Sequence, residues 1–208
     1  MSLPSVLLLR TAGTNCDEEA CFAFEQAGAR VTPVHVRALC EHPGKLDEHA
    51  MLVLPGGFSY GDDLGSGVVL ANEIAQRLME PFTRFVERGG LAIGICNGFQ
   101  VLVKTGLLPG KACAAQPPLA GNGRTGGGAC ATLTFNDSQH FEDRWIWLRV
   151  EKSASPFLAG QHGRLVTFPV AHGEGKFVAR DEAALQRIQA AGQVAFRYVN
   201  ADGSPPSY

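Results

Sequence analysis

The 208-residue sequence has no long apolar run and no excess of charge of one sign. No segment approaches the roughly 20 consecutive apolar residues that a membrane-spanning helix needs. The first four residues, Met-Ser-Leu-Pro, lack the basic flank of a signal peptide. Lys and Arg number 18 against 20 Asp and Glu, whereas nucleic-acid-binding proteins usually carry a basic excess. We therefore expect a cytoplasmic protein that has no nucleic-acid partner and no membrane partner.

Motifs for metal and nucleotide binding are also missing. None of the six cysteines stands in a C-x-x-C pair or at zinc-site spacing from a histidine, so we expect reduced thiols and no metal. No phosphate-binding G-x-x-x-x-G-K-[ST] or G-x-G-x-x-G motif occurs at a strand–helix junction. The sequence therefore predicts no cofactor bound by this chain.

Hydrophobic residues make up 45% of the chain, enough to build a core. In the first half, short apolar runs alternate with segments of helical periodicity, which is typical of a mostly parallel sheet with helices on both faces. Pro81 lies inside one of the helical segments, and we expect it to kink or divide that helix. The predicted strands are residues 5–10, 31–36, 51–54 and 91–94, and the predicted helices are 17–27, 74–88 and 99–105.

The residue composition and the order of predicted elements change in the second half of the chain. Residues 110–128 are rich in Gly, Ala and Pro, which predicts a loop. Several strands then follow without helices between them, which favours an added antiparallel or mixed β region. We expect strands at 129–135, 144–150, 164–170 and 194–199 and a helix at 181–191, all within a single α/β domain over residues 1–208.

The strongest chemical signal is Gly94-Ile-Cys96-Asn-Gly98, between a predicted strand and a predicted helix. This G-x-Nuc-x-G pattern is typical of a nucleophile elbow, in which the nucleophile stands on a sharp turn. Glycines two residues to either side leave room for the turn, and the following helix N-terminus favours a thiolate. The alternative is an ordinary buried cysteine in a strand–helix turn.

A second candidate element follows the strand over residues 51–54. Gly56 and Gly57 would lie at the same carboxyl edge of the sheet as Cys96, where α/β folds bind ligands. A Gly-Gly pair lets backbone N–H groups approach a substrate carbonyl, as an oxyanion hole requires. A tight turn without catalytic meaning is the alternative.

These motifs resemble a known family. Residues 94–100 are similar to the G-x-C-x-G-x-Q signature of class I glutamine amidotransferases. Together with residues 13–17, 55–62 and 169–177, they resemble the glutaminase subunits of phosphoribosylformylglycinamidine synthase. The resemblance implies a flavodoxin-like fold and hydrolysis of glutamine to glutamate and ammonia. The synthase subunit of this ATP-dependent C–N ligase would use the ammonia, with ATP and Mg²⁺, to convert formylglycinamide ribonucleotide to formylglycinamidine ribonucleotide in purine biosynthesis.

The resemblance also implies roles for individual residues. Cys96 matches the nucleophile that forms a glutamyl thioester. Gly56, Gly57 and Asn97 match the oxyanion and glutamine-binding positions, with backbone N–H donors at Gly57 and Asn97. Gln100, one helical turn after Cys96, matches a position that lines the glutamine pocket.

One part of the family pattern is missing. The family's catalytic base is the histidine of a His-x-Glu pair near the C-terminus, but no histidine follows His172 here. His172 and Glu174 have the same spacing, yet they match a separate family element, for which we expect a structural or pocket-shaping role. The alternative is that His172 itself acts as the catalytic base. We expect a chain truncated at its C-terminus that hydrolyses glutamine poorly. The alternatives are a catalytically silent fragment or subunit that only binds the synthase, and another hydrolase with a cysteine elbow.

Overall fold

The computed structural model describes residues 3–110 and 130–206, which fall into two compact units. The first unit comprises residues 3–108, and the second comprises residues 109–110 and 130–206. The loop predicted over residues 110–128 lies, apart from Gly110, outside the described residues. That the chain is a single, truncated domain stays a prediction.

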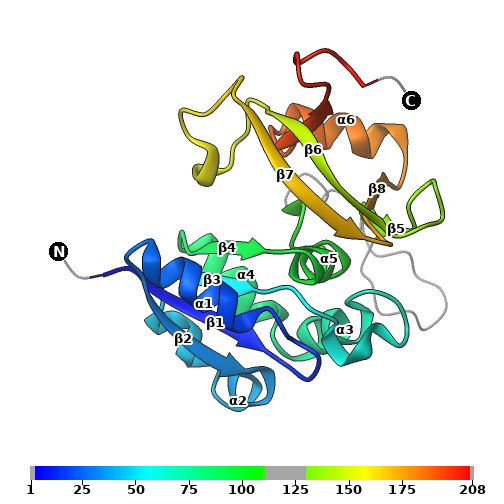
Figure 1. Ribbon diagram of the computed structural model, residues 1–208. Helices are drawn as coiled ribbons and strands as arrows, with labels where there is room; N and C mark the ends of the chain where they lie inside the picture. Colours follow the sequence, from blue (N-terminus) through cyan, green and yellow to red (C-terminus); the bar gives the residue numbers. More distant parts are fainter. Residues whose placement is uncertain (1–2, 111–129, 207–208) are drawn as a thin grey trace. The chain divides into compact units, whose positions relative to one another are not determined.

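The first unit is built on a four-stranded parallel sheet with the order β2-β1-β3-β4 (Figure 1). The side chains of Val6–Leu9 in β1 are almost completely buried, as expected for a parallel strand covered on both faces. The strand order reverses at β1, so the carboxyl ends of β1 and β3 flank the crevice where such sheets bind ligands. The strands are β1 (Ser5–Arg10), β2 (Arg30–His35), β3 (Met51–Leu54) and β4 (Leu91–Gly94).

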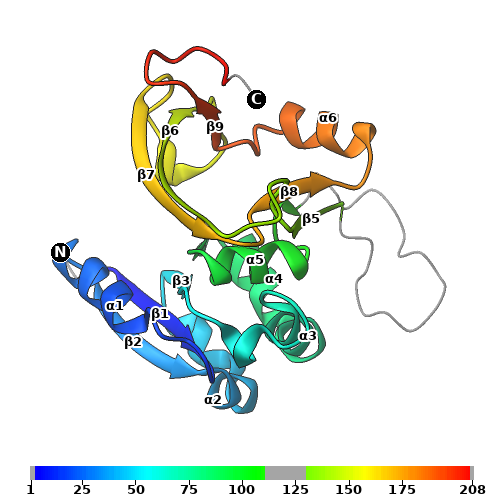
Figure 2. The same ribbon diagram turned by 45° about the vertical axis from the view of Figure 1, so that its right-hand side comes forward.

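Helices cover both faces of this sheet, which confirms the predicted α/β architecture. Helix α1 (Asp17–Gln26) lies against one face of the sheet (Figure 2). On that face, Ala20 packs with Val6 and Leu8. A larger apolar cluster fills the other face and joins the sheet to four helices. These helices are the short α2 (Val36–Glu41), which was not predicted, α3 (Val68–Arg77), α4 (Met79–Glu87) and α5 (Asn97–Lys104).

The helix predicted over residues 74–88 is two helices, and Pro81 does not separate them. The break falls at Leu78, which ends α3 and caps α4. Pro81 is the third residue of α4, where a backbone N–H would have no partner within the helix, so proline is tolerated there. Leu78 is completely buried together with Phe82 and Phe85, which shows that core packing decides where the chain bends.

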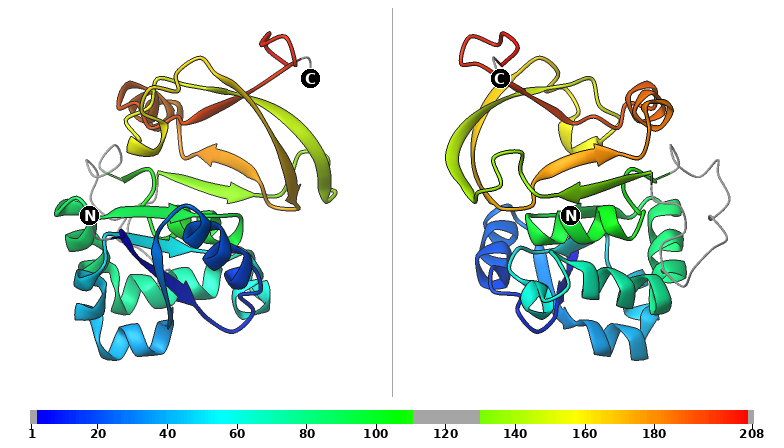
Figure 3. Two further views of the ribbon diagram at one scale, coloured as in Figure 1. Left: turned by 60° about the vertical axis from the view of Figure 1, so that its left-hand side comes forward. Right: turned by 90° about the vertical axis from the view of Figure 1, so that its right-hand side faces the viewer.

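The second unit is antiparallel, which confirms the added β region. Its three-stranded sheet has the order β7-β6-β9, and the strongly bent β6 and β7 are the longest strands (Figure 3). The strands β5 and β8 form a separate two-stranded antiparallel sheet. The strand β8 has four residues and was not predicted. The bounds are β5 (Ala131–Thr134), β6 (Glu142–Val150), β7 (Leu165–His172), β8 (Lys176–Ala179), α6 (Glu182–Ala190) and β9 (Phe196–Val199).

Candidate active site

Cys96 stands in the sharp turn that joins β4 to α5 in the first unit. Its backbone has φ +51°, a conformation that is costly for any residue other than glycine and that clusters at functional sites. Its thiol is exposed, and α5 begins at the next residue, so the helix N-terminus stabilises negative charge at the sulfur. The local geometry is that of a nucleophile elbow.

The two flanking glycines are required by close backbone contacts. A Cβ atom at Gly98 would lie 1.9 Å from the carbonyl oxygen of Leu54, which shows how tightly α5 packs on the end of β3. A Cβ atom at Gly94 would lie 2.5 Å from the carbonyl oxygen of Gly98. Both distances are far below van der Waals contact, so neither position accepts a side chain.

The loop after β3 lies directly against Cys96. A Cβ atom at Gly56 would be 3.4 Å from Cys96 Cβ and 3.6 Å from Cys16 Sγ. Gly57 has φ +130°, and a Cβ atom there would meet Asn15 at 2.7 Å. The loops that follow β1, β3 and β4 therefore meet at one edge of the sheet. This edge is where the strand order predicts a ligand crevice.

Two backbone N–H groups belong to the residues that directly follow Cys96 and Gly56. Within the described residues, neither the Gly57 N–H nor the Asn97 N–H donates a hydrogen bond to another part of the chain. Asn97 directly follows Cys96, and Gly57 directly follows the glycine that touches it. Free N–H groups next to a nucleophile are what an oxyanion hole needs. The site can therefore accept a carbonyl compound for attack by Cys96.

The side chain of Asn97 has a role that the sequence did not indicate. It is 3% exposed and uses all its hydrogen-bonding groups. Its Nδ2 donates to Gln100 Oε1 at 3.1 Å and to the Asp62 carboxylate at 3.0 Å, while its Oδ1 accepts from Ser59 N at 3.2 Å. Gln100 is thus a buried partner of Asn97, and its contact with glutamine stays a prediction. The only sequence signal for Asp62 was its place at the end of the Gly-rich loop.

The remaining described cysteines are Cys16, Cys21, Cys40 and Cys130. Burial, together with nearby negative charges including Glu19, raises the pKa of Cys16. Burial also raises the pKa of Cys21 and of Cys40. Cys130 is in a disulfide bond, so the expectation of reduced thiols is wrong for that residue. Sequence spacing gave no indication of this bond.

We expect Cys96 to be the most reactive of the four free thiols in the described part of the chain when the protein is treated with limiting iodoacetamide at pH 7, because it is exposed and the N-terminus of α5 favours its thiolate. Cys16, Cys21 and Cys40 have raised pKa values and stay protonated at this pH, and the thiolate is the reactive form. Peptide mapping by mass spectrometry measures the order of labelling. Preferential labelling of Cys16 or Cys21 at pH 7 would contradict the assignment of Cys96.

His172 and Glu174 belong to the second unit, where His172 ends β7. The His172 Nδ1–H donates to Asn136 Oδ1 at 2.9 Å, and Asn136 Nδ2 donates back to the His172 carbonyl at 2.8 Å. A Cβ atom at Gly175 would lie 2.1 Å from the imidazole ring. Asn136 and His172 therefore hold the turn after β7 together, and the role of His172 in the family reaction stays a prediction.

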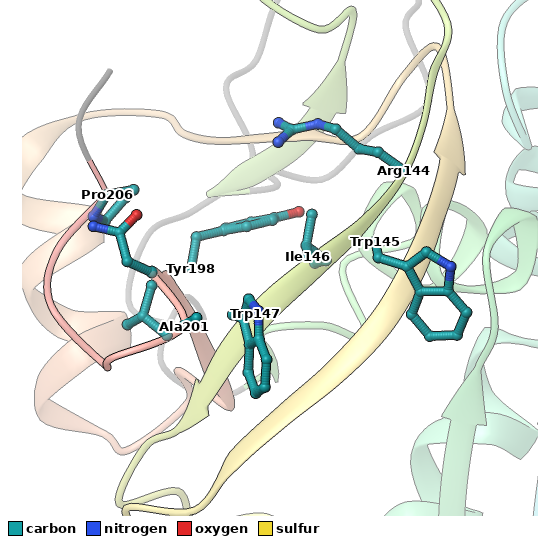
Figure 4. A pocket seen from close by; sticks show the side chains of 9 residues that line it. Arg144, Trp145, Ile146, Trp147, Tyr198, Ala201 and Pro206 are labelled. Atoms are coloured by element: carbon teal, nitrogen blue, oxygen red, sulfur yellow. The ribbon is translucent and has the colours of Figure 1, made fainter.

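A cavity of about 220 Å³ also lies in the second unit, on β6 and β9 (Figure 4). Ile146 and Tyr198 point toward one another across it, while Trp145 is turned away. The cavity contains none of the predicted site residues. Within the described ranges, no helix is long and apolar enough to cross a membrane, and no three His, Cys, Asp or Glu side chains are grouped to hold a metal ion.

Comparison with known families agrees with this geometry. A family model described as a CobB/CobQ-like glutamine amidotransferase domain matches residues 3–207. The phosphoribosylformylglycinamidine synthase subunit PurQ of Dehalococcoides mccartyi is 47% identical over 88% of this chain and 66% of its own length. The PurQ subunit of Methanococcus maripaludis is 35% identical over 98% of this chain and 70% of its own length.

Comparison with solved structures also finds chains of glutamine amidotransferase fold. The chain is similar to one in the structure of PurLQS from Thermotoga maritima, with a TM-score of 0.69 and 32% identity over 96% of this chain and 76% of that one. A putative GMP synthase component from Thermoplasma acidophilum, at 14% identity and a TM-score of 0.53, shares the fold, over 88% of this chain and 70% of that one. Fold and site thus define a glutamine amidotransferase domain. Within that class, the chain belongs to the family of phosphoribosylformylglycinamidine synthase subunits PurQ.

Proposed function

We propose that this chain hydrolyses glutamine to glutamate and ammonia, and delivers the ammonia to a synthase subunit that makes formylglycinamidine ribonucleotide with ATP. Membership of the PurQ family and the likeness to a PurLQS chain support the substrate and the partner. The single observation that carries the chemistry is the exposed Cys96 on its elbow, against the Gly56–Gly57 loop. We also propose a cytoplasmic location, since the synthase reaction consumes ATP.

The geometry supports a specific sequence of steps. The Cys96 thiolate attacks the amide carbon of glutamine, and the carbonyl oxygen becomes an oxyanion held by the N–H groups of Gly57 and Asn97. Collapse of this intermediate breaks the C–N bond, and the leaving nitrogen takes up a proton to depart as ammonia. Water then hydrolyses the thioester, which releases glutamate and regenerates the thiol. Gln100 would help to shape the pocket by fixing Asn97.

The departure of ammonia and the attack of water on the thioester both require proton transfer. His172 is the last histidine of the sequence, and its Nδ1–H is bonded to Asn136. Loss of a general acid–base group typically costs about 10²–10⁴-fold in rate. A loss of this size would define the second candidate function, a subunit that binds the synthase without turning over glutamine efficiently.

One experiment separates the two functions. The chain is combined with the synthase subunit from its own organism, formylglycinamide ribonucleotide, ATP and Mg²⁺, and supplied with either glutamine or ammonium chloride. A glutaminase supports product formation from both nitrogen sources. A silent subunit supports product formation from ammonium alone. Failure to co-purify with the synthase subunit would contradict both functions.

We propose that ATP and Mg²⁺ are bound by the synthase subunit and that this chain itself needs no cofactor. Attack of a thiolate on an amide requires no nucleotide, and the sequence carries no phosphate-binding motif at a strand–helix junction. Isothermal titration of the isolated chain with Mg²⁺–ATP should therefore give no binding heat, whereas the complex should bind. Micromolar binding by the isolated chain would contradict this division of roles.

A further inference from the structure

The Asp62 carboxylate joins three segments of the first unit around the elbow. Its Oδ1 accepts from Gly67 N at 2.9 Å and from Asn97 Nδ2 at 3.0 Å, and its Oδ2 lies 3.2 Å from the same amide nitrogen. Gly67 caps α3, Asn97 opens α5, and Asp62 itself ends the loop after β3. One charged group therefore ties the loop to both helix N-termini.

The contacts of Asn97 extend this connection to the oxyanion donors. Because Nδ2 is held by Asp62 and Gln100, the Asn97 Oδ1 is aimed at Ser59 N, two residues after Gly57. The Asn97 side chain thus links the residue that follows the nucleophile to the loop that carries Gly57. Hydrogen bonds to a carboxylate are about twice as strong as those between neutral groups, so Asp62 is the strongest anchor in this network.

The loop also needs an anchor, because its backbone is strained. Tyr60 and Asp62 both have φ +54°, and Cys96 across the network has φ +51°. Non-glycine residues in this region persist only where surrounding contacts hold them. The Asp62–Asn97 bonds connect one strained residue, Asp62, to the neighbour of another, Cys96. Their loss would free the loop and the turn to relax independently.

We propose that Asp62 is a positioning residue for the oxyanion hole. Through its hydrogen bonds to Asn97, it fixes the positions of the Gly57 and Asn97 backbone N–H groups relative to Cys96. The inference deepens the proposed function and rests on its assignment of Cys96 as nucleophile. Asp62 touches no reacting atom in this mechanism. Its effect is on the rate of steps that form an oxyanion, and not on the sulfur itself.

The test compares two reagents that react with Cys96, one through an oxyanion and one without an oxyanion. Both are applied to the chain in complex with its synthase subunit. Acylation of Cys96 by p-nitrophenyl acetate passes through an oxyanion, and its leaving group needs no general acid. Alkylation by iodoacetamide displaces iodide and forms no oxyanion. We expect Asp62→Ala to slow the acylation by about 10–100-fold, as loss or misplacement of an oxyanion donor does, and to leave the alkylation rate unchanged.

Matched variants complete the design. Asp62→Asn keeps an oxygen for Gly67 N and Asn97 Nδ2 and should lose less than about 10-fold in acylation, while Asp63→Ala, which removes the neighbouring exposed carboxylate, should match the wild type. Cys96→Ser supplies the background from other thiols. Equal acylation by Asp62→Ala and wild type overturns the proposal, and so does an equal fall in both reactions, which would mean collapse of the elbow.

The same preparation separates this inference from the proposed function. Wild-type complex is assayed for product formation with glutamine alongside the two probes. If glutamine is not used while Asp62→Ala still slows acylation selectively, the glutaminase assignment fails and the role of Asp62 stands. If glutamine is used and Asp62→Ala behaves as wild type with both probes, the proposed function stands and this inference fails.

Discussion

Replacing Cys96 by serine is expected to abolish glutamine-dependent synthesis by the complex, with a loss of at least about 10³-fold. Serine has nearly the same shape, but its hydroxyl is a far weaker nucleophile than a thiolate. Its neighbours Gly56 and Asn97 have no basic side chain that could activate the hydroxyl. Product formation is measured with glutamine and then with ammonium chloride. The ammonium-dependent rate should not change, because it bypasses the thiol.

Cys16→Ser is the matched control for this substitution. Cys16 lies at the same edge of the sheet, with its sulfur 3.6 Å from the position of a Cβ atom at Gly56. It is exposed, as Cys96 is, but it does not stand on the elbow. We expect its glutamine-dependent rate to stay within about threefold of wild type. A Cys96→Ser enzyme with more than a tenth of the wild-type rate would remove the basis for the proposed mechanism.

Gly98→Ala should be strongly destabilising, costing at least about 3 kcal/mol in the free energy of unfolding. The added Cβ would lie 1.9 Å from the Leu54 carbonyl oxygen, so α5 must move off the end of β3. Urea denaturation followed by circular dichroism measures the effect. Failure of the variant to fold agrees with the prediction, whereas a change below about 1 kcal/mol would contradict it.

Two other glycines make the comparison specific. Gly44 has no atom within 4 Å of an added Cβ and no positive φ, so Gly44→Ala should change stability by less than about 0.5 kcal/mol. Gly106 also has open space but a φ of +79°, so Gly106→Ala should cost about 1–2 kcal/mol through backbone strain alone. The difference between these variants and Gly98→Ala isolates the steric contact between α5 and β3.

Predictions from the sequence were most successful where the signal is local. The run over residues 5–10 is completely apolar apart from its ends, and β1 has the predicted bounds. The elbow was identified from five consecutive residues, because glycine at fixed offsets from a nucleophile reports directly on a backbone that admits no side chain. The equally short β3 and β4 were found because each is an uninterrupted run without a charged residue. The strand β8 begins with Lys176, and α2 contains Arg37 and Glu41, so neither shows such a run and both were missed.

The sequence by itself determined which chemistry the chain presents: a cysteine between two glycines, after a buried strand and before a helix. Only the tertiary structure decided which groups support that cysteine. Asn97 and Asp62 are 35 residues apart, and His172 and Asn136 are 36 apart. Hydrogen bonds between such distant residues depend on the order in which strands pair and helices pack. No local pattern encodes that order, which is why the role of Asp62 emerges only from the folded chain.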